Sequence, residues 1–154
     1  MAAATPAEPV VTQDRRLGVA WVLLCCALAA HVADEALTGF LSVYNPTAAE
    51  IGRRTGFYPP SFGFSEWLAG LIVAVLVLLA LSPLAFANHR FWRPLAYFFS
   101  VIMLLNGAAH TAGTIAGRTF ADITFSRPMP GFYSSPLLLA GSVYLLLQLR
   151  RTRR

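Results

Sequence analysis

The chain alternates four long apolar stretches with short polar ones. The apolar stretches cover residues 17–41, 66–87, 94–115 and 132–149. Each contains close to the roughly 20 residues that an α-helix needs to cross a bilayer core about 30 Å thick. The pattern predicts an all-α fold, a four-helix transmembrane bundle made by residues 17–149. Residues 1–16 are expected to form a disordered cytoplasmic tail, and residues 150–154 a short basic cytoplasmic tail.

The composition agrees with a membrane protein. Of 154 residues, 56% are hydrophobic and only 12% are charged, whereas about a quarter of the residues in a soluble domain are charged. The basic residues are all arginine, and they form short clusters between or beyond the apolar stretches. The sequence therefore argues against a nucleic-acid partner and against most soluble enzymes. The lipid bilayer is the first partner to expect.

The distribution of arginine predicts which way the helices face. With the N-terminus inside, the cytoplasmic segments contain Arg15, Arg16, Arg90, Arg93, Arg150, Arg151, Arg153 and Arg154. The external segments then contain only Arg53, Arg54, Arg118 and Arg127. Cytoplasmic segments of membrane proteins carry the excess of basic residues. Both termini are therefore expected in the cytoplasm, in a multi-pass protein of the plasma membrane or the bacterial inner membrane.

An alternative interpretation of the N-terminus is a secretory signal peptide. Arg15 and Arg16 precede a short apolar run, and Ala27-Leu28-Ala29 has the small-residue spacing of a cleavage site. Residues 1–29 would then be processed. The helical pattern continues past that position, which favours an uncleaved first span.

The first span contains polar residues that hydrocarbon does not tolerate without partners. His31, Asp34 and Glu35 follow an otherwise apolar run. At about 100° per residue, Asp34 lies about 60° to one side of His31 and Glu35 about 40° to the other, so the three share one helical face. An ionisable group in a membrane span is costly unless it is paired, metal-bound, protonated or close to water. This face is therefore a candidate functional site.

The third apolar span has a similar polar face. Asn106 and His110 are four residues apart, about one helical turn. At 1.5 Å per residue, His31 lies roughly 21 Å from the start of the first span, and His110 roughly 24 Å from the start of the third. Both spans start at the cytoplasmic side in the expected orientation. The two imidazoles are therefore predicted to lie at a similar depth, in the outer half of the bilayer.

Three short motifs occur in order along the chain: His31-Val-Ala-Asp34-Glu35, Asn106-Gly-Ala-Ala-His110 and Pro128-Met129-Pro130-Gly131. Their order and spacing resemble the HXXEE family of membrane proteins. The first motif has Asp where that family has its first Glu, and the last keeps the family's Pro-Gly but not its Tyr. The resemblance spans roughly residues 17–149. It implies a membrane architecture and a set of candidate residues, but no reaction.

Two imidazoles and one or two carboxylates form a donor set for a metal. His31, Glu35 and His110 are the first ligands to expect, and Asp34 is either a fourth ligand or a general base. Two His plus one carboxylate suit a catalytic zinc with an open coordination position, or a non-haem iron. The alternative is a metal-free hydrogen-bonded cluster, which could still move protons on a substrate. Haem bound by both histidines is less favoured, because the carboxylates would crowd and charge its face.

Four secondary candidates each have a simpler structural explanation. Asn106 could orient His110 or bond to a neighbouring helix. Glu66 could join the site or stabilise the N-terminal end of a helix. Arg127 could hold an anionic group or extend to the membrane interface. Tyr133 could donate a proton or anchor the chain at the interface.

The expected function is that of an HXXEE-like membrane enzyme whose partner is a hydrophobic small molecule or lipid. It would act as a hydrolase with one divalent metal or as an acid/base isomerase. One alternative is a non-catalytic accessory or binding protein for a lipid, pigment, quinone or haem. Another is a small proton- or ion-coupled transporter, which would require an oligomer because four helices rarely enclose a path alone.

Overall fold

The protein is all-helical over the residues that the structure describes. A computed structural model describes residues 10–151, and residues 1–9 and 152–154 of the two expected tails lie outside the described residues. The helices are α1 (Val10–Thr38), α2 (Leu41–Thr55), α3 (Phe64–Ala80), α4 (Ser82–Phe86), α5 (Trp92–Ala116) and α6 (Ser135–Arg151). Within residues 10–151, β-pairing is limited to an isolated bridge between Arg118 and Thr124.

Three helical stretches are long and apolar enough to cross a membrane: Asp14–Thr38, Phe64–Phe86 and Trp92–Ala116. They correspond to the first three spans predicted from the sequence. Helices are expected there, because hydrocarbon offers the backbone no partners and a helix satisfies its own hydrogen bonds. The fourth predicted span, residues 132–149, differs. Its helix, α6, begins only at Ser135 and has 17 residues, a length of about 25 Å.

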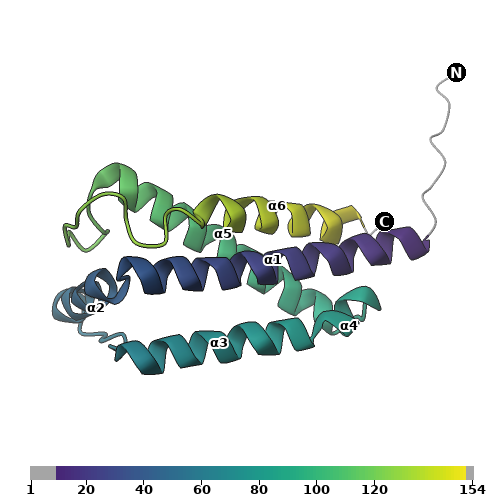
Figure 1. The fold of residues 1–154 in the computed structure, drawn as a ribbon, viewed down its shortest axis with the longest axis horizontal. Helices are drawn as coiled ribbons and strands as arrows, with labels where there is room; N and C mark the ends of the chain where they lie inside the picture. Colours follow the sequence, from purple (N-terminus) through teal and green to yellow (C-terminus); the bar gives the residue numbers. More distant parts are fainter. Residues whose placement is uncertain (1–9, 152–154) are drawn as a thin grey trace, which may run out of the picture.

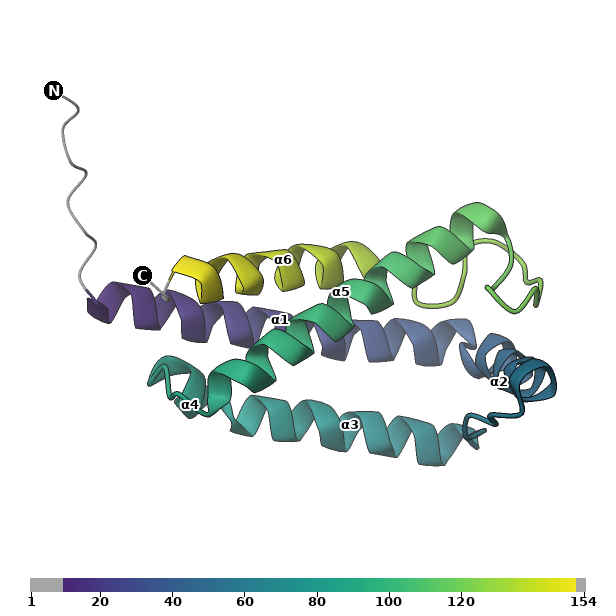
Figure 2. The ribbon, with the colours of Figure 1, turned by 180° about the vertical axis from the view of Figure 1, so that it is seen from behind.

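Helices α1, α3 and α6 lie close to the long axis of the molecule, and α5 crosses the bundle obliquely (Figures 1 and 2). Helices α1 and α5 run from the end that contains α4 towards the end that contains α2, and α3 and α6 run back. Helix α6 packs against both α1 and α5, while α3 packs against α1. Helix α2 and the loop between α5 and α6 therefore lie together at one end of the molecule.

The first helix differs at both ends from the predicted span 17–41. It starts at Val10, so residues 10–16, which were expected in a disordered tail, are helical. It ends at Thr38, and Gly39 follows with φ of 76°. Glycine adopts this left-handed conformation at little cost. The chain turns sharply there, and α2 lies across the end of the bundle (Figure 1).

Aromatic packing holds the end of the molecule that contains α4. The ring of Trp21 meets the rings of Trp92 and Phe99 edge to face, with centroids 5.1 Å and 5.2 Å apart. Its indole Nε1–H donates a hydrogen bond of 3.0 Å to the carbonyl of Leu78, close to the junction of α3 and α4. Trp21 thus joins α1 to α3 and α5. His31, Glu35 and His110 lie towards the opposite end, in the later parts of α1 and α5.

Candidate metal site

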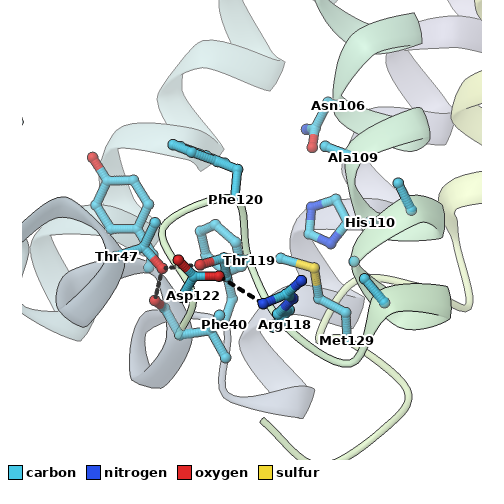
Figure 3. Close-up of a pocket in the computed structure, with 15 residues that line it drawn as sticks. Phe40, Thr47, Asn106, Ala109, His110, Arg118, Thr119, Phe120, Asp122 and Met129 are labelled. Atoms are coloured by element: carbon cyan, nitrogen blue, oxygen red, sulfur yellow. Dashed lines mark hydrogen bonds and ion pairs between the residues drawn. The ribbon is translucent and has the colours of Figure 1, made fainter. Parts of the chain in front are cut away.

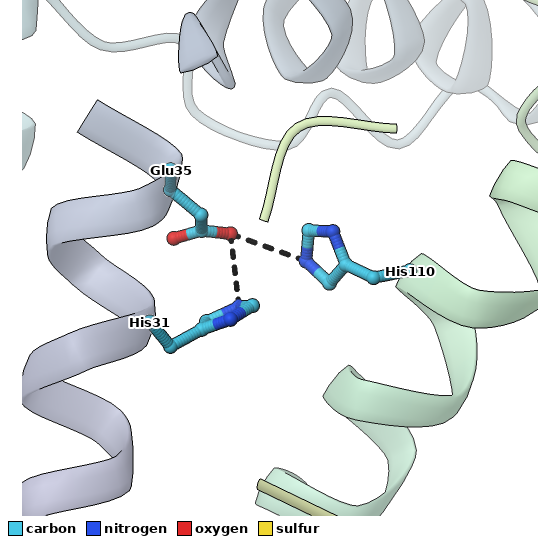
Figure 4. A group of neighbouring side chains, drawn as sticks. All are labelled: His31, Glu35 and His110. Carbon is cyan, nitrogen blue, oxygen red and sulfur yellow. Dashed lines mark ion pairs between the residues drawn. The ribbon is translucent and has the colours of Figure 1, made fainter. Parts of the chain in front are cut away.

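Three buried side chains from two helices meet towards the α2 end of the molecule (Figure 4). His31 and Glu35 lie one turn apart on α1, and His110 comes from α5. Oε1 of Glu35 lies 3.4 Å from Nε2 of His31 and 3.2 Å from Nε2 of His110. The two imidazole rings pack edge to face with centroids 4.7 Å apart. This His31–Glu35–His110 group could hold a metal ion.

Close packing of α5 on α6 brings the loop between them over this group. A methyl group added at Gly107 of α5 would lie only 3.1 Å from the carbonyl oxygen of Ser135 and 3.0 Å from Cγ of Leu139. Glycine at this position therefore lets the start of α6 approach α5 closely. Residues 127–134 then reach back to the ends of α1 and α5.

The loop determines which nitrogen of His110 faces Glu35. Nδ1 of His110 lies 2.5 Å from the carbonyl oxygen of Pro130. A carbonyl oxygen can only accept a hydrogen bond, so Nδ1 carries the hydrogen and donates it. In the neutral imidazole the other nitrogen, Nε2, then carries a lone pair. That lone pair is on the nitrogen that faces Glu35.

Ser134 has the same effect on His31. Its Oγ lies 2.8 Å from Nδ1 of His31 and 2.8 Å from Oδ2 of Asp34. A carboxylate accepts, so the hydroxyl donates to Asp34 and receives the Nδ1–H of His31. The backbone N–H of Ser134 donates to the same carboxylate oxygen, at 2.8 Å. Asp34 therefore orients His31 through Ser134, and it stands outside the three residues whose ligand atoms converge.

These hydrogen bonds leave two lone pairs directed at one carboxylate. Nε2 of His31 is completely buried and has no hydrogen-bond partner among the described residues. Acceptor atoms at 3.2–3.4 Å repel one another unless a cation or a proton lies among them. Ligands 2.0–2.2 Å from a tetrahedral ion are about 3.3–3.6 Å apart, which is close to the two nitrogen–oxygen separations of 3.4 Å and 3.2 Å in this group. The donor set, its spacing and its outer hydrogen bonds fit a divalent metal.

Gly131 closes the site from the loop side. Its φ of 84° suits glycine, and a methyl group there would lie 2.8 Å from Cε1 of His110 and 2.9 Å from Cγ of Glu35. Its backbone N–H donates to Oγ1 of Thr38, at 3.2 Å. The Pro-Gly pair of the third motif thus covers the three-residue group with backbone alone. A larger residue at position 131 would have to displace a ligand side chain.

Comparison with models of known protein families, with curated proteins and with solved structures finds no match for this chain.

The remaining predicted residues lie around this group. Asn106 is half-buried on α5, one turn before His110, and lines a cavity beside it. Glu66 is exposed in the first turn of α3. Tyr133 is 68% exposed. Arg127 is also exposed, and its guanidinium lies beside Gly117 at the end of α5.

A cavity of about 620 Å³ lies next to the metal site, with His110 in its wall (Figure 3). Its other lining residues come from the start of α2, the second half of α5 and the loop after α5. The ring of Phe40 lies between α1 and α2 and packs 5.6 Å from the imidazole of His110, centroid to centroid. Of the three ligand residues, His110 is the one that lines this cavity.

Sequence reasoning missed Ser134 as a site residue. Ser134 directly precedes α6, and its carbonyl accepts the backbone N–H groups of Leu137 and Leu138. A serine at the start of a helix is normally read as a capping residue, so its sequence position gave no signal for the site. The Pro-Gly pair was visible as a motif, but its contact with His110 and Glu35 depends on how the loop folds back.

Proposed function

We propose that this chain is a multi-pass membrane protein of the HXXEE type, and that it is an enzyme acting on a hydrophobic, lipid-derived substrate. The reaction would take place at His31, Glu35 and His110, in the outer half of the bilayer. The observation that carries the proposal is the convergence of two Nε2 atoms on one buried carboxylate, next to an apolar cavity. Such a pocket with a few convergent polar groups is typical of a small-molecule site.

The proposed topology has four passes, with both termini in the cytoplasm. Helix α6 would be the fourth pass, because it runs antiparallel to α5 and packs along α1 and α5. Arg150 and Arg151 at its end would lie in the cytoplasm, where basic residues concentrate. The metal site would then face the outer leaflet.

Each residue has a defined part in this proposal. His31, Glu35 and His110 would hold a zinc or iron ion. A divalent cation in this position would supply Lewis-acid chemistry, polarising a carbonyl or phosphoryl oxygen of the substrate. Pro130 and the Asp34–Ser134 pair hold the two rings in the required tautomers. Burial of the group and the cover of the loop exclude bulk water.

Metal analysis of the purified protein tests this proposal. We expect one equivalent of zinc or iron in the native or metal-supplemented chain, and its loss in His31→Ala and His110→Ala. His89→Ala is the matched control, because His89 is exposed in the turn between α4 and α5, far from the site in the chain. Absence of metal from both preparations of the native chain, or equal loss in His89→Ala, would rule out the metal enzyme.

A metal-free acid/base enzyme is the second candidate. Glu35 lies within reach of both imidazoles, so a proton shared among these three groups would also relieve the repulsion between their acceptor atoms. A carboxylate and an imidazole in an apolar site can take a proton from a substrate and return it at another position, as an isomerase does. This candidate predicts activity on a hydrophobic substrate that chelators do not inhibit and that Glu35→Gln abolishes.

A further inference from the structure

The cavity beside His110 has a long apolar wall. Ala109, Ala112, Gly113 and Ala116 line it from α5. These positions are three or four residues apart and lie on one face of the helix. None of them carries more than a methyl group, so the space in front of this face stays open. Phe40, Val43, Phe120 and Met129 are among the residues that line the rest of the cavity.

The apolar wall on α5 extends to either side of His110, a residue of the candidate metal site. His110 lies between Ala109 and Ala112 on the same helix, and its ring forms part of the cavity lining. The face extends from Asn106 to Ala116, ten residues or about 15 Å along the helix axis. A linear apolar molecule lying along α5 would therefore contact the His110 ring partway along its length.

The outer rim of the cavity is charged. Arg118 and Asp122 line it and form an ion pair of 2.9 Å. Arg54 reaches the same carboxylate at 3.1 Å, and Arg53 and Arg54 both bind Glu50 at 2.6 Å. This rim cluster has three guanidinium groups and two carboxylates, which leaves one positive charge. Arg118 is 61% exposed and has donors free to bind a further anion.

We propose that this cavity binds a single-chain lipid with an anionic headgroup. The acyl chain would lie along the alanine face of α5, past His110, and the headgroup would bind at Arg118. The cavity volume falls in the range that holds one compact ligand, which suits one chain and not two. Such a lipid would be the substrate of the proposed enzyme, so its role as a substrate rests on the proposed function. Binding of the lipid itself requires no metal.

Photolabelling of the full-length, chelator-treated protein in detergent tests the inference. The probe is a long-chain fatty acid with a diazirine on its chain, and labelled peptides are located by mass spectrometry. We expect labelling of residues 109–116 or of the loop that contains Phe120 and Met129. Ala112→Phe should lower labelling by about tenfold or more, because a phenyl ring fills the space that the chain would occupy.

Ala108→Phe is the matched control for the chain-binding part. Ala108 is exposed on the same helix and does not line the cavity, so this variant should label like the native chain. Retained metal binding by Ala112→Phe would show that the site is still folded. Equal labelling of Ala112→Phe and Ala108→Phe, or labelling spread over the exposed face of α3, would overturn the inference.

The headgroup is tested with a neutral probe of the same chain, a diazirine monoacylglycerol. Arg118→Gln should weaken labelling by the fatty acid and leave labelling by the monoacylglycerol unchanged. Equal labelling by both probes in the native protein would overturn the anionic headgroup. The two proposals fail separately: labelling of the chelator-treated chain supports the lipid site whether or not the native protein holds a metal, whereas absence of metal from the native protein contradicts only the metal enzyme.

Discussion

Ser134 determines which nitrogen of His31 faces Glu35 and His110. The carboxylate of Asp34 accepts hydrogen bonds from both the hydroxyl and the backbone N–H of Ser134. The hydroxyl oxygen of Ser134 in turn accepts a hydrogen bond from Nδ1–H of His31. Hydrogen-bond partners of metal-ligating histidines orient the ring and raise its basicity. Asp34, which the sequence suggests as a metal ligand, thus contacts Ser134 and orients His31 through it.

We predict that Ser134→Ala lowers the affinity for zinc about 10–100-fold, the usual effect of losing such a partner. Competition with a chromogenic chelator measures this affinity. Ser135→Ala is the control, because Ser135 is also buried and its hydroxyl donates to the carbonyl of Gly131, at 2.8 Å, and not to a site side chain. Ser134→Thr keeps the hydroxyl and should restore most of the affinity. An unchanged affinity in Ser134→Ala would remove the positioning role.

Among the helices, α2 carries a network of ion pairs at its C-terminal end. Glu50 binds Arg53 three residues on and Arg54 four residues on, a spacing that brings side chains together on a helix. The two basic residues also lie in the last turn, where cations interact favourably with the helix dipole. Arg54 continues to Asp122, so α2 is tied to the loop after α5.

These guanidinium groups lower the pKa of Glu50 from 4.5 to about 2. A carboxylate with a lowered pKa stabilises the folded state fully above its ordinary pKa. That contribution is lost as the pH falls from 4.5 through about 2. We predict an NMR titration midpoint near 2 for the Glu50 carboxyl, and a return towards 4.5 in Arg53→Gln/Arg54→Gln. A native midpoint near 4.5 would contradict the ion-pair geometry.

At the scale of the whole molecule, the two ends have different roles. The end with α4 is packed by Trp21, Trp92 and Phe99. Towards the other end lie the candidate metal site, the cavity and the charged rim. In the proposed topology the aromatic end is cytoplasmic and the rim is external, so a lipid of the outer leaflet could reach the cavity.

Cysteine labelling of intact cells tests this orientation. Arg127→Cys should react with a membrane-impermeant maleimide, and Arg90→Cys should react only after permeabilisation. Both positions are exposed, and they belong to opposite ends of the molecule. The chain without an added cysteine is the control: Cys25 is buried and Cys26 lies within an apolar span. The reverse labelling pattern would place both termini outside.

The amino-acid pattern alone predicts the three long apolar helices and the similar level of His31 and His110 along two of them. Hydrophobic stretches of about 20 residues must be helical in hydrocarbon, and three of them are long and apolar enough to span in the structure. The helical repeat put His31 and Glu35 on one face. The rise per residue put His31 and His110 at one level, where the structure brings their rings together.

The difference between Asp34 and Glu35 depends on which segments pack against α1. The two carboxylates flank His31 on opposite sides of one helix face, so their spacing alone treats them almost equally. His110 of α5 approaches on the side of Glu35, while the loop before α6 places Ser134 against Asp34. The cavity, too, depends on α2 and the loop folding over α5. These contacts join residues about 70 to 100 positions apart, and helical periodicity carries no information about them.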